Sequence, residues 1–448
     1  MKRILGLHTS IFLVAAMLLA GCGTFEVVIE PVVAPATETP AATQPVPAVV
    51  TATPTNEVVP TITATVRPTA QIVKGRAAAG LTVRIETLRM LDSQNGWCIG
   101  TVNSGPDDHI FRTIDGGQTW RDLTPPVLPS NLGENSLAAV GHFVSPMQAW
   151  VVFSPRDAAP PAGKVVIWST INGGQTWDES EPLDLSGMTT EFFIADSLGF
   201  SDRLHGWLLA HLGAGMSKDY IAIFTTADGG KTWLRVADPD SISTLMSCSK
   251  TGLAFTDAQN AWLVGDCPGL MPGLFAYHSS DGGQNWNQVA LPAPAGQSAN
   301  LFSRVESGCG FLGIAHSSAE ALTITLRCQM YETAKPASWL YISRDGGMTW
   351  NAQGLPAPYG SLNFLDSRSG WLLGTMKQYD PEAGAELFRT VDGGLNWVSV
   401  LSVGWLGEPV FVDSEKGWVV AQAGGTSALV NTTNGGAFWQ ELFPVVGP

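Results

Sequence analysis

The chain has 448 residues and a formal net charge of −15 at pH 7. An acidic surface repels the phosphates of nucleic acids and anionic lipid head groups, so this charge argues against nucleic acid as a partner. Hydrophobic residues make up 45 % of the sequence, which is enough to form a large buried core.

Residues 1–22 are typical of an export signal. Lys2 and Arg3 precede a mainly apolar run that ends at Ala20, and a run of this kind is not a membrane span. The run leads into Leu-Ala-Gly-Cys, which resembles the lipobox of bacterial lipoproteins, in which Cys22 carries the lipid. The alternative is a cleaved signal followed by an unrelated cysteine. We therefore expect an extracytoplasmic protein that is anchored to the cell membrane only through a lipid on Cys22.

Residues 23–80 form a segment rich in Pro, Thr, Ala and Val. No aromatic residue occurs between Phe25 and Trp97. Without aromatic anchors such a segment cannot bury enough apolar surface to offset the entropy of ordering it. We expect a disordered tether that holds the following domain away from the lipid surface.

Residues 81–448 contain one short pattern seven times. Each copy has a hydroxyl residue, an Asp or Asn two positions later, a Gly-Gly pair and a Trp. The polar centres are Asp115, Asn172, Asp228, Asp281, Asp345, Asp392 and Asn434, and the tryptophans are Trp120, Trp177, Trp233, Trp286, Trp350, Trp397 and Trp439. Successive centres lie 42 to 64 residues apart, which favours one propeller blade per repeat.

A second motif precedes each copy and completes the repeat. It places an apolar residue and an acid before Gly-Trp, as in Phe200, Asp202 and Trp207, which predicts a tight hairpin. Each repeat then contains four antiparallel strands, the third being a segment such as His109–Thr113. The sequence therefore predicts an all-β, single seven-bladed propeller over residues 81–448. Because the first and last repeats each have four strands of their own, ring closure needs no exchanged strand.

Five cysteines follow Cys22. Cys248 and Cys267 are 19 residues apart, as are Cys309 and Cys328, and each pair brackets the first hairpin of a repeat. Antiparallel strands bring such positions opposite each other, so we expect two disulfides and an oxidising compartment rather than four buried thiols. Cys98 is expected to be a buried free thiol.

Propeller topology places the two repeated turns of every blade on one face. On that face the repeated acids are expected to stabilise their own turns, because recurrence in every blade is what folding requires. The opposite face carries the irregular loops, where recognition is expected. These loops contain three neighbouring pairs of a tyrosine and an acid, which are Asp219 with Tyr220, Tyr331 with Glu332, and Tyr379 with Asp380.

The seven-fold pattern resembles the Asp-box, or bacterial neuraminidase repeat, of sialidases and related propellers. Together with the Gly-Trp turn, it is similar to the photosystem II stability and assembly factor family, whose members resemble seven-bladed propellers. That resemblance implies a role in assembling a membrane complex. Sialidase chemistry needs a cluster of arginines, whereas Arg112 and Arg389 lead directly into Asp-boxes on the opposite face.

These observations lead to a prediction of a monomeric, non-catalytic binding scaffold. It is expected to bind a protein or glycan partner at the cell surface, with no cofactor, no metal and no catalytic residues. The alternative is an extracytoplasmic carbohydrate-active enzyme, a glycoside hydrolase of the Asp-box propeller type, using a pair of carboxylates.

Overall fold

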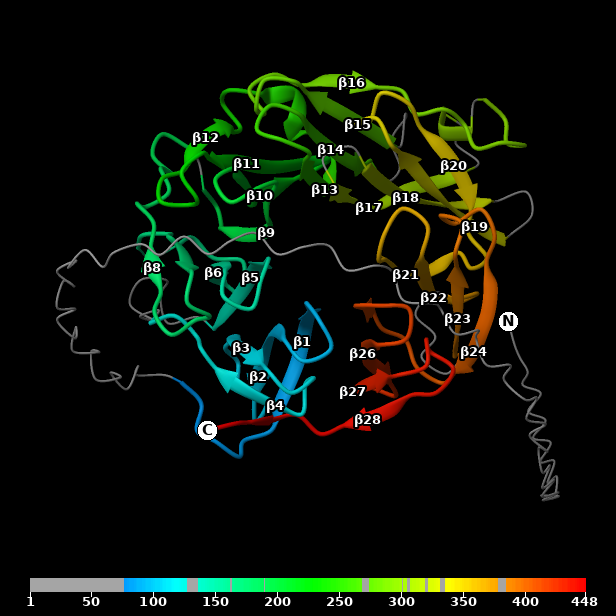
Figure 1. Ribbon diagram of the computed structural model, residues 1–448. Coiled ribbons are helices and arrows are strands. Elements are labelled where there is room, and N and C mark those ends of the chain that lie inside the picture. The colour runs from blue at the N-terminus through cyan, green and yellow to red at the C-terminus, as the bar shows by residue number, and fades with distance from the viewer. Residues whose placement is uncertain are drawn as a thin grey trace, which may run out of the picture. The chain divides into compact units, whose positions relative to one another are not determined.

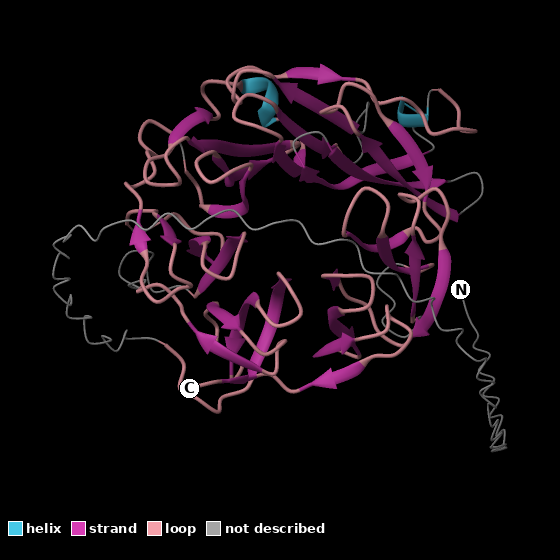
Figure 2. Cartoon of the chain, viewed as in Figure 1, coloured by secondary structure: helices cyan, strands magenta, loops and turns pink. Residues whose placement is uncertain are grey.

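The computed structural model describes residues 76–126, 136–161, 163–188, 190–267, 274–299, 301–303, 307–318, 321–330, 335–377 and 384–448. The expected export signal with Cys22 and nearly all of the expected tether lie outside the described residues. No helix in the described ranges is long and apolar enough to cross a membrane. The helices described there are two 3-10 segments, η2 (Ser243–Met246) and η3 (Leu301–Ser303), visible among the strands in Figure 2.

Seven blades, each with four antiparallel strands of its own, stand around a central axis, which confirms the predicted seven-bladed, all-β fold (Figure 1). Blades 1 to 3 consist of β1 (Val83–Met90), β2 (Gly96–Val102), β3 (His109–Thr113) and β4 (Thr119–Asp122); β5 (Leu137–Phe143), β6 (Ala149–Pro155), β7 (Ile167–Thr170) and β8 (Asp178–Glu179); and β9 (Ile194–Phe200), β10 (Gly206–Gly215), β11 (Lys218–Thr226) and β12 (Leu234–Ala237).

Blades 4 to 7 repeat the same order. They consist of β13 (Ser249–Phe255), β14 (Ala261–Asp266), β15 (Leu274–Ser279) and β16 (Asn287–Val289); β17 (Ser307–Ser318), β18 (Ala321–Met330), β19 (Lys335–Ser343) and β20 (Asn351–Gly354); β21 (Tyr359–Phe364), β22 (Gly370–Thr375), β23 (Ala385–Thr390) and β24 (Val398–Val403); and β25 (Pro409–Phe411), β26 (Gly417–Ala423), β27 (Thr426–Thr432) and β28 (Gln440–Leu442).

Strand burial follows position in the blade. Second strands such as β22 are buried along their whole length, because the neighbouring blades cover both of their faces. Outer strands such as β8 are exposed. The first strands of neighbouring blades contact one another around the axis, as β5 does with β9. The core is therefore a ring of apolar layers between blades.

The Asp-box turns are built in the same way in all blades. In the first copy Gly116 and Gly117 have φ values of 76° and 93°, a conformation that strongly favours glycine. The Thr113 hydroxyl donates to Asp115 at 2.8 Å and accepts the Gly117 amide at 2.9 Å. The Asp115 carboxylate also accepts the Thr119 amide at 3.0 Å. The repeated residues therefore form one closed hydrogen-bonded turn.

The two repeated turns of a blade lie on the same face, as predicted. The amide of the first glycine in an Asp-box donates to a carbonyl in the first turn of its own blade, for example Gly116 to Gln94 at 2.9 Å and Gly173 to Met147 at 2.8 Å. We call this face the turn face. The opposite face, which carries the second turn of each blade and the crossings between blades, is called the irregular face.

Tryptophans of the first turns join a blade to the next in all blades but the fifth, whose sequence has Leu322 in this position. Indole N–H groups donate across the blade boundary to carbonyls of the next blade, at 2.8 Å from Trp150 to Gly229 and at 2.9 Å from Trp418 to Gly116. The Trp150 ring also stacks on Phe200, the motif phenylalanine of the next blade, with centroids 3.8 Å apart. Where both aromatic residues occur, as in Trp371 and Phe411, they are therefore two halves of one contact between blades.

Ring closure has a component that the sequence analysis did not anticipate. Blades 1 and 7 each use four strands of their own, but a fifth strand, β29 (Val445–Val446), pairs in parallel with β4 at the outer edge of blade 1. The Gly80 amide donates to the Val446 carbonyl at 2.8 Å, and the Val446 amide to the Leu81 carbonyl at 2.8 Å. The two ends of the propeller are thus hydrogen-bonded together.

We predict that Trp418→Phe lowers the free energy of unfolding by about 1–3 kcal/mol, because the Gly116 carbonyl loses its buried donor. Urea unfolding measures the change. Trp439→Phe is the matched control, since the Trp439 indole nitrogen is buried and finds no hydrogen-bond partner among the described residues. Equal decreases in the free energy of unfolding of the two variants would show that the hydrogen bond between blades 7 and 1 does not contribute to stability.

Candidate functional site

The acids of the turn face are committed to their own turns. Hydrogen bonds from Thr349 lower the pKa of Asp345 to about 2, and hydrogen bonds from Asn396 lower the pKa of Asp392. In the second copy the neutral amide oxygen of Asn172 accepts the Thr170 hydroxyl and the Thr176 amide, both at 3.0 Å. Because an uncharged residue makes these bonds too, the turn does not depend on a carboxylate's charge.

The arginines beside the Asp-boxes also have structural contacts. The guanidinium of Arg112 lies 5.9 Å from the ring centroid of Trp97, and that of Arg389 lies 5.2 Å from Trp371. Both arginines therefore cover motif tryptophans on the turn face. They are not gathered into a clamp for a substrate carboxylate.

A charged cluster lies on the irregular face where blade 3 meets blade 4. His211 of β10 has its Nδ1 atom 2.7 Å from Asp219 of β11 and its Nε2 atom 3.7 Å from Asp196 of β9. Asp219 also accepts the backbone amide of Lys250, the second residue of β13, at 3.0 Å. The cluster thus joins three strands of one blade to the first strand of the next.

Lys250 is buried beneath this cluster. Its ammonium group donates to the carbonyls of Cys248 at 2.9 Å, Ser247 at 3.1 Å and Asp219 at 3.2 Å. Burial lowers the pKa of Lys250 to about 8. Burial alone would also lower the pKa of His211, but the carboxylates of Asp196 and Asp219 outweigh it and raise that pKa to about 9. At neutral pH the imidazole is therefore charged and fixed between two carboxylates.

The structure separates the residues of the predicted Asp219 and Tyr220 pair. Neighbouring residues on a strand point to opposite faces, so Asp219 reaches His211 while Tyr220 packs against the apolar core between blades 3 and 4. They do not form a joint tyrosine and acid site. Tyr331, Glu332, Tyr379 and Asp380 lie outside the described residues.

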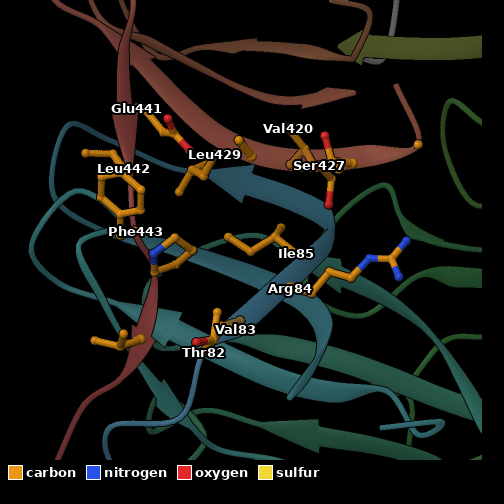
Figure 3. A pocket seen from close by; sticks show the side chains of 15 residues that line it. Thr82, Val83, Arg84, Ile85, Val420, Ser427, Leu429, Glu441, Leu442 and Phe443 are labelled. Atoms are coloured by element: carbon orange, nitrogen blue, oxygen red, sulfur yellow. The ribbon is translucent and has the colours of Figure 1, made fainter. Parts of the chain in front are cut away.

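A groove opens on the irregular face between blades 7 and 1 (Figure 3). Its volume is about 430 Å³, within the usual range for ligand pockets. Ile85 of β1 and Leu429 of β27 form its apolar walls, and Phe443 lies beside them in the segment after β28. Arg84 and Glu441 also line the groove. It can therefore hold an apolar side chain next to a charged group.

Two disulfides lie toward the irregular face in blades 4 and 5. Cys248 pairs with Cys267 at the open end of the first hairpin of blade 4, and Cys309 pairs with Cys328 directly across β17 and β18. Both predicted disulfides are thus present, and Cys98 is a buried free cysteine. Disulfides of this kind are typical of an oxidising, extracytoplasmic compartment.

Within the described residues no three His, Cys, Asp or Glu side chains are grouped so that they could hold a metal ion. His211, Lys250 and the groove were not predicted from the sequence. The local signal for the cluster was the spacing of His211 and Asp219, which are eight residues apart on either side of a hairpin turn.

The comparisons agree with this geometry. The BNR/Asp-box repeat family model matches residues 341–352, which is the fifth Asp-box. The photosystem II assembly protein Ycf48 of Thermosynechococcus vestitus is 22 % identical over 320 residues, covering 65 % of this chain and 80 % of that protein.

Two solved structures are similar to this chain at low identity. YCF48 from Cyanidioschyzon merolae is 18 % identical with a TM-score of 0.44, covering 80 % of this chain and 97 % of that one. An ulvan lyase of polysaccharide lyase family PL25 is 10 % identical with a TM-score of 0.47, covering 83 % and 97 %.

The blades and their turns define an Asp-box β-propeller with seven blades. Within that class, the chain resembles the photosystem II assembly factors.

We predict that His211→Gln destabilises the propeller by about 1–3 kcal/mol at neutral or lower pH, because two carboxylates lose their charged partner. His211 stabilises fully below its ordinary pKa of 6.5, and this stabilisation is lost as the pH rises through about 9. The difference between wild type and variant in urea unfolding should therefore shrink toward high pH. Lys250 titrates in both proteins, so its effect cancels in that difference. A difference independent of pH would mean that His211 is not charged in the fold.

Proposed function

We propose that this protein is an extracytoplasmic scaffold that binds a partner protein through its irregular face and assists assembly of a membrane or envelope complex. The similarity to a photosystem II assembly protein over most of the propeller carries this proposal. That relative is named for assembling a membrane complex, and an extracytoplasmic propeller is suited to the same kind of task on another complex.

The two faces differ in how their polar residues are used, and this difference supports a binding role. Acids and arginines of the turn face make bonds that the fold itself needs, so they offer little for a reaction. The irregular face has the groove, with an apolar interior and the charged Arg84 and Glu441 among its lining residues. An apolar anchor in a pocket with polar groups at its rim is the usual centre of a protein interface.

The proposed anchor of the chain is a lipid on Cys22. The Leu-Ala-Gly-Cys sequence supports it, and the disulfides agree with export. A long tether between the lipid and the propeller would let the domain reach a partner above the membrane. We propose that the propeller acts as a monomer.

We predict that Phe443→Ala reduces capture of the partner at least five-fold, because Phe443 lines the groove and is 76 % exposed. The experiment is affinity purification of the intact tethered protein from detergent-solubilised membranes, with bound proteins quantified by mass spectrometry. Phe438→Ala is the matched control. Phe438 is 67 % exposed and lies on the turn face at the other end of β28. Neither substitution removes a buried contact, so both variants should unfold at nearly the wild-type midpoint.

Equal capture by both variants would contradict recognition through the groove. A second contrary outcome is that the purified protein cleaves glycosides or polysaccharides, and loses this activity when a carboxylate of the irregular face is replaced. That result would contradict the scaffold and support the alternative of a carbohydrate-active enzyme.

A further inference from the structure

The boundary between blades 5 and 6 lacks the tryptophan that the other boundaries have. In six blades the second residue of the second strand is a tryptophan. Strand pairing places it opposite the residue before the Asp-box hydroxyl, as Trp371 lies opposite Arg389. In blade 5 the residue in this pairing is Thr323, opposite Ile342, and not Leu322. A threonine therefore occupies the place of the tryptophan that faces the next blade.

The motif phenylalanine of blade 6 is less buried as a result. At four boundaries an indole ring stacks on the motif phenylalanine of the next blade, in the pairs Trp97–Phe143, Trp150–Phe200, Trp207–Phe255 and Trp371–Phe411. Those four phenylalanines are at most 6 % exposed. Phe364 is only half-buried, and no residue of its strand β21 is buried. Phe364 therefore keeps ring surface that a tryptophan covers in the other blades.

A cavity lies at this boundary. Its volume is about 650 Å³, within the usual range for ligand pockets. Thr323 and Thr325 of β18 line it from blade 5, and Phe364 and Gly393 line it from blade 6. Clusters of buried apolar residues join every other pair of neighbouring blades, but none formed by the described residues joins blades 5 and 6. The cavity thus stands where the other boundaries have an apolar core.

Gly393 supplies the hydrogen-bond acceptor that an indole uses at the other boundaries. There, in four cases, the carbonyl of an Asp-box glycine accepts the indole N–H of the preceding blade. Gly393 has the same φ of 76° as Gly116, one of those four acceptors. Its amide also donates to a carbonyl of the first turn, that of Arg368 at 2.7 Å. The turn therefore has the geometry that accepts an indole, and the second strand of blade 5 has no indole to offer.

The charges around the cavity balance. Its charged lining residues are two cations and two anions, namely Arg89, Arg344, Asp366 and Glu408. The Asp366 carboxylate accepts the amides of its own turn, and the Arg344 guanidinium donates to the Ser367 carbonyl at 3.2 Å. A lining without net charge favours neither an anionic nor a cationic ligand.

We propose that this cavity binds a small, uncharged, planar aromatic molecule with a ring N–H, of the indole class. The ring stacks on Phe364, and its N–H donates to the Gly393 carbonyl. The ligand thereby takes the place that a tryptophan side chain fills at the other boundaries. This site is separate from the groove between blades 7 and 1, and it does not depend on the proposed function.

The test is isothermal titration calorimetry of the intact protein with indole as the probe. Binding of 1-methylindole, which has no N–H, should be about five-fold weaker or more, because the hydrogen bond to Gly393 is lost. Thr323→Trp places a side-chain indole in the cavity and should weaken indole binding about ten-fold or more, because a filled site has no room for a second ring. The same variant should unfold at a higher temperature than the wild type.

Leu395→Trp is the matched control. Leu395 is 62 % exposed in the Asp-box of blade 6 and does not line the cavity, so an indole there should leave binding unchanged. If Thr323→Trp does not fold, Phe364→Leu decides, and it should weaken indole binding because the stacking surface is lost. The proposal is overturned if the wild type does not bind indole, or if it binds indole and 1-methylindole equally. Binding that a folded Thr323→Trp or Phe364→Leu variant retains at the wild-type level overturns it as well.

Discussion

The ring depends on contacts between blades in which a tryptophan of one blade donates its indole N–H to a carbonyl of the next. Two of these tryptophans, Trp150 and Trp371, also stack on the motif phenylalanine of the next blade. Four such bonds reach an Asp-box glycine of the next blade, from Trp150, Trp262, Trp371 and Trp418. The last of them spans 302 residues and closes the circle. A buried carbonyl without a hydrogen-bond donor destabilises the fold. Each of these bonds therefore couples the Asp-box turn of one blade to the packing of the preceding blade against it.

At four boundaries this contact gives the Asp-box a role beyond its own turn. The glycine pair places its carbonyls where the neighbouring tryptophan can reach them, and the Asp or Asn holds that conformation by accepting the turn's own donors. Asn172 and Asn434 make the same hydrogen bonds to the hydroxyl residue as the aspartates do. A residue that can lose its charge without changing its contacts is a structural residue. The acids of the turn face therefore stabilise blades, and we propose that recognition of the partner belongs to the other face.

Local signals explain what could be predicted from the sequence. Glycine pairs, aromatic residues and cysteine spacings act within one hairpin, so the blades, the turns and both disulfides were predictable. The pairing of Val445 with Thr119 was not, because a two-residue strand has no periodicity and its partner is at the other end of the chain.

Long-range geometry also explains what was missed in the candidate site. The groove uses residues 82–85 and 420–445, which only ring closure brings together. The cluster around His211 combines β9, β10, β11 and β13. Tyr220 was grouped with Asp219 because they are adjacent in sequence, yet a strand directs adjacent side chains apart.

The most direct test of the central claim is amide hydrogen exchange with and without the captured partner. The account predicts new protection on the irregular face, at the start of β1 and around the turn between β26 and β27, with unchanged exchange in all seven Asp-box turns. New protection at the Asp-box turns, with none beside the groove, would contradict it.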